Sequence, residues 1–212
     1  VLHGEGSFAG DNPHFQTTLT WQGLQWPLMA NGPAKTLVNS TNGKLSAVGT
    51  PQAYQLQLDT DLQGQDIPKG RWQVVGQGDS QHLQLNRVTG AVLQGNLDLS
   101  GKIRWQPSIN WELILRGNHL NPGNQWPDWP GKIALDIHSQ GQFQDDTLET
   151  QVEVKQVQGQ LRHYPLKLQT TLGVKGSQYD IKGLNFQSGP ARLTVDGHLG
   201  QHSNLNWDLQ IP

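Results

Sequence analysis

The residues that could carry out chemistry are few and poorly grouped in this sequence. Asp145 and Asp146 are adjacent carboxylates, but the surrounding stretch GQFQDDTLE is typical of a solvated turn rather than of an acid–base pair. His198 and His202 are four residues apart, yet Gly200 lies between them and the segment lacks helical spacing, so a zinc pair on one helix face is not expected. The chain has no cysteine, which excludes thiolate metal sites, disulfides and cysteine catalysis. The sequence therefore predicts no enzyme, no catalytic residue, no metal site and no cofactor.

The stretch NPGNQWPDWPG is the second candidate site, because it carries Trp126, Pro127, Trp129 and Pro130. The prolines prevent both helix formation and ladder pairing, so we expect a rigid loop with two indoles. Such a loop could cap an open sheet, plug a groove or offer a stacking platform for a sugar. Capping by packing against the protein itself is the favoured interpretation.

Composition points to a sheet protein without a strong electric field. The net charge is −2 over 212 residues, which gives no reason to expect nucleic acid or an anionic membrane surface as a partner. With 34% hydrophobic residues, 25 Gly and 12 Pro, the chain favours short strands and many turns. No apolar run reaches the 18 or so residues that span a bilayer. The start VLHGEG has no initiator Met and no signal-peptide pattern, so we expect a segment of a longer protein.

Apolar residues alternate with polar ones along most of the chain. Tyr54, Leu56 and Leu58 take one face of a predicted strand, and Gln55 and Gln57 take the other. Helical spacing is not sustained anywhere, and the weak helical candidate is PAKTLV at 33–38. The pattern predicts an all-β fold.

A repeat of 96 residues organises these strands. The segment 96–115, NLDLSGKIRWQPSINWELIL, aligns without a gap on 192–211, RLTVDGHLGQHSNLNWDLQI. Gly101 coincides with Gly197, and Trp111 coincides with Trp207. The chain is therefore expected to be part of a modular sheet with approximate units 1–53 (partial), 54–115 with a loop to 149, and 150–212.

The apolar face of such a sheet must be covered, and no helix is predicted to cover it. A β-sandwich would close it with a second sheet. Alternatively, one elongated sheet would curl along its length into a groove with an apolar concave interior. Glycines inside strands, such as Gly95 and Gly183, suit a bent sheet and a sandwich corner equally well.

The residues in the apolar phase are the predicted lining of this groove. They are Leu56, Leu58, Leu97, Leu99, Ile103, Trp105, Ile109, Trp111, Leu113, Leu115, Ile133, Leu135, Ile137, Val152, Val154, Leu166, Leu168, Leu172, Val174, Leu193, Val195, Leu199, Leu205, Trp207, Leu209 and Ile211.

Several stretches resemble the TamB family of AsmA-like bridge proteins. They are LNPG at 120–123, WPGKI at 129–133, GQLRHYP at 159–165 and ARLTVDGHLG at 191–200, and the resemblance is clearest over 95–212. The resemblance implies a U-shaped sheet, the β-taco or repeating β-groove, with an apolar inside and a polar outside.

The resemblance also implies function and location. Members of the family are periplasmic, anchored in the inner membrane, and reach the outer membrane, where they meet the barrel protein TamA through regions outside this chain. They are implicated in conducting phospholipid, through its acyl chains, to the outer membrane and in outer-membrane protein and autotransporter assembly. The expected function is thus a non-enzymatic, lipid-conducting groove segment.

Two other classes of function stay open at the level of sequence. One is a scaffold or chaperone that holds unfolded outer-membrane proteins by β-augmentation. The other is a carbohydrate-binding or adhesin β-sandwich that uses Trp126 and Trp129.

Overall fold

The computed structural model describes residues 2–211 except 10–12, 27–37, 65–66 and 146. These residues form a 14-stranded sheet in which spatial order equals chain order, β1 to β14. The strands are β1 (Leu2–Ala9), β2 (His14–Trp26), β3 (Val38–Thr50), β4 (Ala53–Gly64), β5 (Gly70–Gly78), β6 (His82–Val92), β7 (Gly95–Arg104), β8 (Asn110–Leu120), β9 (Gly131–Gln144), β10 (Thr147–Leu161), β11 (Tyr164–Lys175), β12 (Gln178–Ser188), β13 (Ala191–Leu199) and β14 (Asn204–Gln210). The element between β8 and β9 is a 3-10 turn, Pro122–Asn124.

Tight hairpins explain why each strand pairs with the next one in the chain. The turn Leu93-Gln94 has φ of 51° and 61°, and Arg162-His163 has φ of 50° and 70°. Two successive left-handed residues make the type I′ turn, whose twist matches that of the flanking strands. Every ladder is antiparallel as a result.

The register between paired strands shifts at several places in the sheet. The pairing shifts between Asn39 and Gly43 on β3, and also on the later strands β6, β8, β10 and β12. A bulge bends its strand and increases the local twist. Bulges that recur in several strands therefore favour a bent and twisted sheet.

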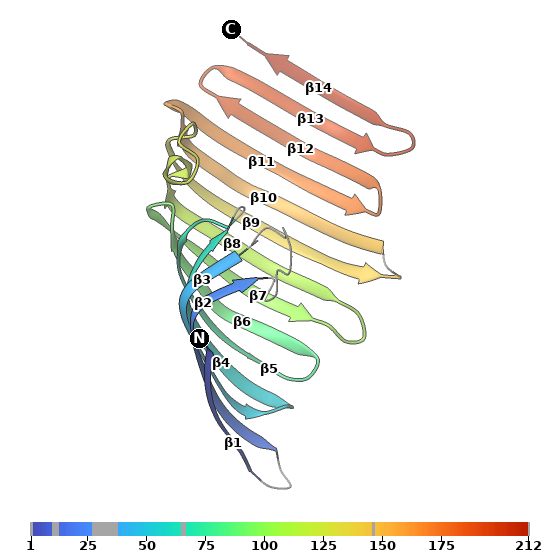
Figure 1. The fold of residues 1–212 in the computed structure, drawn as a ribbon. Coiled ribbons are helices and arrows are strands. Elements are labelled where there is room, and N and C mark those ends of the chain that lie inside the picture. Colours follow the sequence, from blue (N-terminus) through green and yellow to red (C-terminus); the bar gives the residue numbers. More distant parts are fainter. Residues whose placement is uncertain (1, 10–12, 27–37, 65–66, 146, 212) are drawn as a thin grey trace, which may run out of the picture.

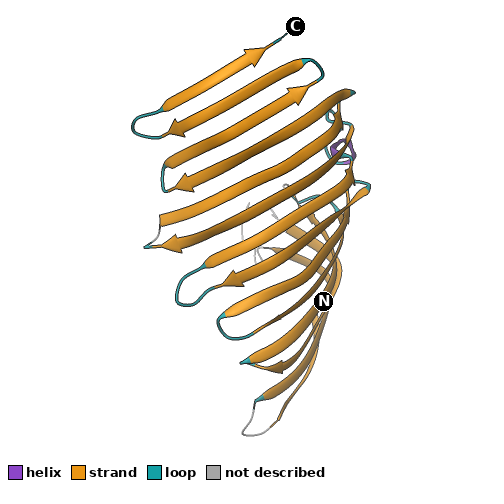
Figure 2. Cartoon of the chain, turned by 180° about the vertical axis from the view of Figure 1, so that it is seen from behind, coloured by secondary structure: helices purple, strands orange, loops and turns teal. Residues whose placement is uncertain are grey.

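The sheet is an elongated, bowed strip (Figure 1). The ends of β2 and β3 pass in front of β6 and β7 in Figure 1, and they lie behind the sheet when it is seen from the other side in Figure 2. The N-terminal strands therefore curl over one face. On that face Leu85, Val88 and Thr60 are less than 9% exposed. The fold is an elongated β-groove with an apolar concave side.

The alternative of a β-sandwich is wrong, because all the described strands belong to one sheet. The physical reason is that successive strands always pair side by side, so no strand leaves to start a second layer. Of the weak helical candidate at 33–38, residues 33–37 lie outside the described residues, and Val38 begins β3.

Strands six apart in the sheet correspond at the 96-residue spacing. β6 and β12 begin and end 96 residues apart, and their register shifts, Leu85/Val88 and Ile181/Leu184, are offset by the same number. The following hairpins differ, however. Leu97 pairs with Gly117, twenty residues on, whereas Leu193 pairs with Leu209, sixteen on. The shorter turn before β14 is closed by Ser203 Oγ, which donates to the Gly200 carbonyl over 3.1 Å.

Candidate functional site

An unbroken row of apolar residues crosses the concave face. Directly opposite partners in an antiparallel ladder project to the same side of the sheet, so the register alone defines the row. Its members, from β2 to β10, are Leu19, Leu45, Leu58, Val74, Val88, Leu99, Leu115, Ile137 and Val154. Eight interstrand steps of about 4.8 Å make this row roughly 38 Å long.

The bulge on β10 carries the row to the remaining strands. Val154 faces Thr170, but the register then shifts and Val157 pairs with Leu168. From Leu168 the row continues through Phe186 and Leu193 to Leu209 on β14. We call the apolar side chains of this whole face the apolar stripe.

The predicted lining residues lie on this one face, with three exceptions. The register places the 23 that belong to strands on the concave side. Trp105 and Ile109 lie in the connection between β7 and β8, and Ile211 follows β14. The Trp105 indole N–H donates to the Ser80 carbonyl over 2.8 Å, so this residue ties two connections together.

Sequence reasoning missed several members of the stripe. Trp72 and Val74 stand opposite Gly90 and Val88, in the middle of the buried part of the face. Trp72 and Val74 follow the same alternation of apolar and polar residues as the other strands, so this period of two could have identified them. Phe186 was missed because the bulge between Ile181 and Leu184 reverses the phase of β12.

Three tryptophans lie over glycines of the next strand. A Cβ built on Gly43 would come within 2.1 Å of the Trp21 ring, and one on Gly90 within 2.8 Å of Trp72. The Trp111 ring covers Gly141 in the same way, at 2.4 Å. The glycine leaves room for the indole to lie flat on the sheet, which keeps the stripe smooth and apolar.

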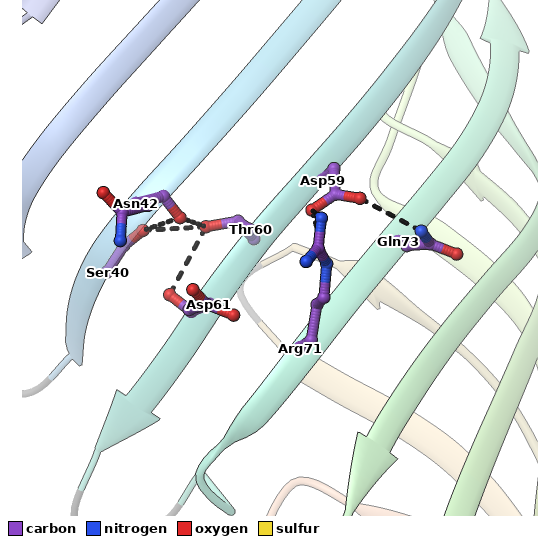
Figure 3. Close-up of polar contacts among 7 residues, drawn as sticks. All are labelled: Ser40, Asn42, Asp59, Thr60, Asp61, Arg71 and Gln73. Carbon is purple, nitrogen blue, oxygen red and sulfur yellow. Dashed lines mark hydrogen bonds and ion pairs between the residues drawn. The ribbon is translucent and has the colours of Figure 1, made fainter.

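The hydroxyl groups of Ser40, Thr60 and Ser139 on the concave face form hydrogen bonds within that face. The Trp111 N–H donates to Ser139 Oγ over 3.0 Å, and the Trp21 N–H donates to Ser40 Oγ over 2.6 Å. Ser40 and Thr60 share a bond of 2.7 Å, and each also lies within reach of the Asn42 carbonyl (Figure 3). Because these groups are satisfied locally, they offer little to a polar ligand.

The opposite face is polar and carries cross-strand ion pairs. Arg71 donates to Asp59 from its Nε over 2.9 Å, and Gln73 donates to the other Asp59 oxygen over 3.0 Å (Figure 3). These two bonds lower the pKa of Asp59. Bonds from Lys175 and Gln142 lower the pKa of Glu149 in the same way. These carboxylates are stabilised as anions, which suits a solvated outer wall.

The loop between β8 and β9 fastens one rim of the groove. We call residues 121–130 the clasp loop. The Asn121 side chain holds this loop by hydrogen bonds. Its Oδ1 accepts from the N–H groups of Gly123 and Gly131, and its Nδ2 donates to Gln94. The Asn121 N–H also donates to the Leu93 carbonyl over 2.7 Å.

Two further bonds extend the clasp loop along the rim. The Lys69 N–H donates to Gln125 Oε1 over 3.3 Å, and the Arg162 N–H donates to the Pro130 carbonyl over 2.7 Å. Below the loop, Val92, Leu93 and Leu120 form a buried apolar cluster. The loop therefore joins the turns before β5, β7 and β11.

The tryptophans and prolines of the predicted rigid loop all lie in the clasp loop. Trp126 and Trp129 are 42% and 48% exposed, so neither indole is packed away. The Arg162 guanidinium carbon lies 5.4 Å from the centre of the Trp129 ring. The indoles therefore stand at the rim, beside Pro127 and Pro130, and not on the floor of the stripe.

The candidate chemical residues do not assemble into a site. Asp145 lies in the turn after β9 with a φ of 48°, and Asp146 lies outside the described residues. His198 is on the polar side of β13, opposite Asp180 and Asn204, and His202 is in the next turn. Within the described ranges no group of three metal-ligating side chains occurs. None of the helical structure in those ranges is long and apolar enough to cross a membrane.

The family model described as TamB, N-terminal domain, matches residues 2–212. The translocation and assembly module subunit TamB of Haemophilus influenzae is 22% identical over 213 residues, which cover 100% of this chain and 16% of that protein. The chain thus spans about a sixth of the length of this relative. No solved structure matches the chain.

Proposed function

The chain belongs to the TamB family, and on that premise we propose that it is a non-enzymatic segment of a groove that conducts phospholipid between the inner and outer membranes. The observation that carries the proposal is the unbroken apolar row from Leu19 to Val154, together with its continuation to Leu209. In this proposal the protein is a subunit of a translocation and assembly module in the periplasm. It is anchored in the inner membrane and meets TamA through parts outside this chain.

The energetics of acyl chains support the proposal. Each methylene group moved from water to an apolar surface gains about 0.8 kcal/mol, so an acyl chain of ordinary length gains on the order of 10 kcal/mol. The groove is open on one side, which allows a charged headgroup to stay in water and avoids the cost of burying it. Hydroxyls such as that of Ser139, which already form hydrogen bonds, offer little to a sliding chain.

The modular arrangement is part of the same proposal. We propose the approximate units 1–53, 54–115 with a loop to 149, and 150–212. The correspondence of β6 with β12 supports a groove that lengthens by adding six strands at a time. Such a groove needs only a continuous stripe from one unit to the next.

The decisive experiment places a charge on each face of the same strand. Leu113 is on the concave face opposite Gly101, and Ile114 is on the polar face opposite Ser100. In the full-length protein, Leu113→Asp should reduce the delivery of radiolabelled phospholipid to the outer membrane at least tenfold. Ile114→Asp is the matched control and should leave delivery unchanged. Normal delivery by Leu113→Asp would refute the lipid groove.

The scaffold function is tested in the same cells. A photo-crosslinker at position 113 should capture phospholipid. If it captures unfolded outer-membrane proteins and no lipid, the groove acts instead as a holding site for those proteins.

A further inference from the structure

A hollow of about 770 Å³ lies where the clasp loop meets β10, β11 and β12. Its lining includes Trp129 from the loop, Tyr164 and Leu166 from β11, and Phe186 from β12. Leu166 and Phe186 project to the concave face, because Leu166 is two residues from Leu168 on the same strand and Phe186 is directly opposite Leu193. The floor of the hollow is therefore continuous with the apolar stripe.

The rim of the hollow carries two opposite charges that do not pair with each other. Arg162 and Asp128 both line it, and both are exposed. Among the described residues, neither side chain forms an ion pair or a side-chain hydrogen bond. A guanidinium and a carboxylate that line one hollow above an apolar floor without pairing are complementary to a headgroup that carries both a phosphate and an ammonium group.

Arg162 is held in place by its backbone. It takes a left-handed conformation, with φ of 50°, which is unfavourable for a residue other than glycine. Its N–H donates to the Pro130 carbonyl, and its guanidinium lies over the Trp129 ring. Contact with the ring face leaves the N–H donors at the edge of the guanidinium available to a phosphate.

We propose that this hollow is a headgroup site for a phospholipid with a zwitterionic, amine-bearing headgroup. Arg162 binds the phosphate, Asp128 binds the ammonium group, and the acyl chains lie on Leu166 and Phe186 and run into the stripe. The inference rests on the proposed function, since it names the lipid class and the place where a headgroup is recognised. The clasp loop then has a second role, because it supplies Asp128 and Trp129.

Other hollows of the described chain lack this combination. The one of about 710 Å³ around Lys44, Asp59 and Arg71 lies on the polar face, and its guanidinium is already paired with Asp59. It has no apolar floor joined to the stripe, so it fits an amphiphile poorly.

The test uses photoactivatable lipids with the full-length protein in vesicles of phosphatidylethanolamine and phosphatidylglycerol. One probe of each lipid carries its diazirine in the headgroup and another at the end of the acyl chain. Headgroup probes should label the clasp loop and Arg162. Arg162→Gln should reduce that labelling about tenfold for both lipids, whereas Asp128→Asn should reduce it only for phosphatidylethanolamine. Arg192→Gln, an exposed arginine on the polar face of β13, is the matched control and should change nothing.

The outcomes separate this inference from the proposed function. If acyl-chain probes label the stripe but Arg162→Gln leaves headgroup labelling unchanged, the headgroup site is refuted and the groove stands. If Asp128→Asn affects both lipids equally, the ammonium contact is refuted. If no probe labels the protein, both proposals fail. Acyl-chain labelling of the stripe in each variant also reports whether that variant is folded.

Discussion

How a side chain of the apolar stripe packs depends on the residue opposite it on the next strand. A tryptophan can lie flat only where its neighbour has no side chain, so each indole and its glycine form one unit. Sequence reasoning found Trp111 and predicted its apolar role, but it could not find Gly141 as its partner. That pairing depends on the register of β8 with β9, across the clasp loop.

The first prediction concerns this pair. Gly141→Ala should destabilise the protein by about 1–3 kcal/mol, because the new Cβ would overlap the Trp111 ring at 2.4 Å and force it off the sheet. Urea unfolding followed by tryptophan fluorescence measures the effect. Gly173→Ala is the control on the polar face, where the nearest atom is the exposed Asp180 Cβ at 3.3 Å. Equal stability of the two variants would contradict the flat packing of the indole.

The second prediction concerns the ionisation of Asp59. Its pKa in the folded state is lowered by bonds from Arg71 and Gln73, so the folded state binds a proton less readily than the unfolded chain does. The bonds therefore stabilise the protein above the ordinary aspartate pKa of about 3.9, and this contribution is lost as the pH falls through the lowered value. Since the pair is exposed, the contribution is at most about 1 kcal/mol.

The measurement compares Asp59→Asn with the unmodified protein over a range of pH. The variant should be less stable at pH 7, and the difference should shrink towards zero as the solution is made acidic. Asp98→Asn is the control, because Asp98 is an exposed carboxylate on the polar face of β7. A difference that grows at low pH would contradict the assigned direction.

Whole elements were predicted well where alternation is regular and poorly where it is interrupted. The period of two in residues such as Leu97 and Leu99 identifies β7 and its apolar face without any tertiary information. The bulges are different, because an extra residue reverses the phase and looks like an irregular sequence. The clasp loop shows the same limit. Its prolines predicted a rigid loop, but its bonds to Lys69, Gln94 and Arg162 join residues far apart in the chain.

The third prediction concerns the clasp loop as an element. Asn121→Ala should cost about 1–3 kcal/mol, because it removes the acceptor for two backbone N–H groups and the bond to Gln94. Hydrogen exchange at Gly123 and Gly131 should become faster while the distant β3–β4 ladder is unaffected. Asn124→Ala, an exposed asparagine in the same loop, should leave these amides protected. Unchanged exchange in Asn121→Ala would mean that the loop is held by its apolar contacts instead.

At the scale of the molecule, the described strands form a linear array in which each strand pairs with the strands next to it in the chain. The described residues form no second layer, so curvature of the sheet is what shields the apolar face, together with the lipid that we propose as its ligand. Sequence alone left the sandwich open, because Gly95 and Gly183 fit either a bend or a corner. The order of strands decides between them, since it shows that the chain advances one strand at a time in one direction.

The last prediction follows from this linear arrangement. If lipid passes along the stripe, blocks at different points act in series, and one complete block is as effective as two. Leu58 on β4 and Val195 on β13 lie in distant parts of the stripe, and each is replaced by Asp. Each variant should reduce delivery of phospholipid to the outer membrane as strongly as the other, and the double variant should be no worse than either one.

The controls are the polar-face neighbours Gln57→Asp and Thr194→Asp, which should transport normally. Binding in separate pockets would behave differently, because each charge would then remove only its own pocket and the two losses would add. Additive losses in the double variant would therefore argue for independent sites, whereas equal and non-additive losses require that every lipid molecule passes both positions.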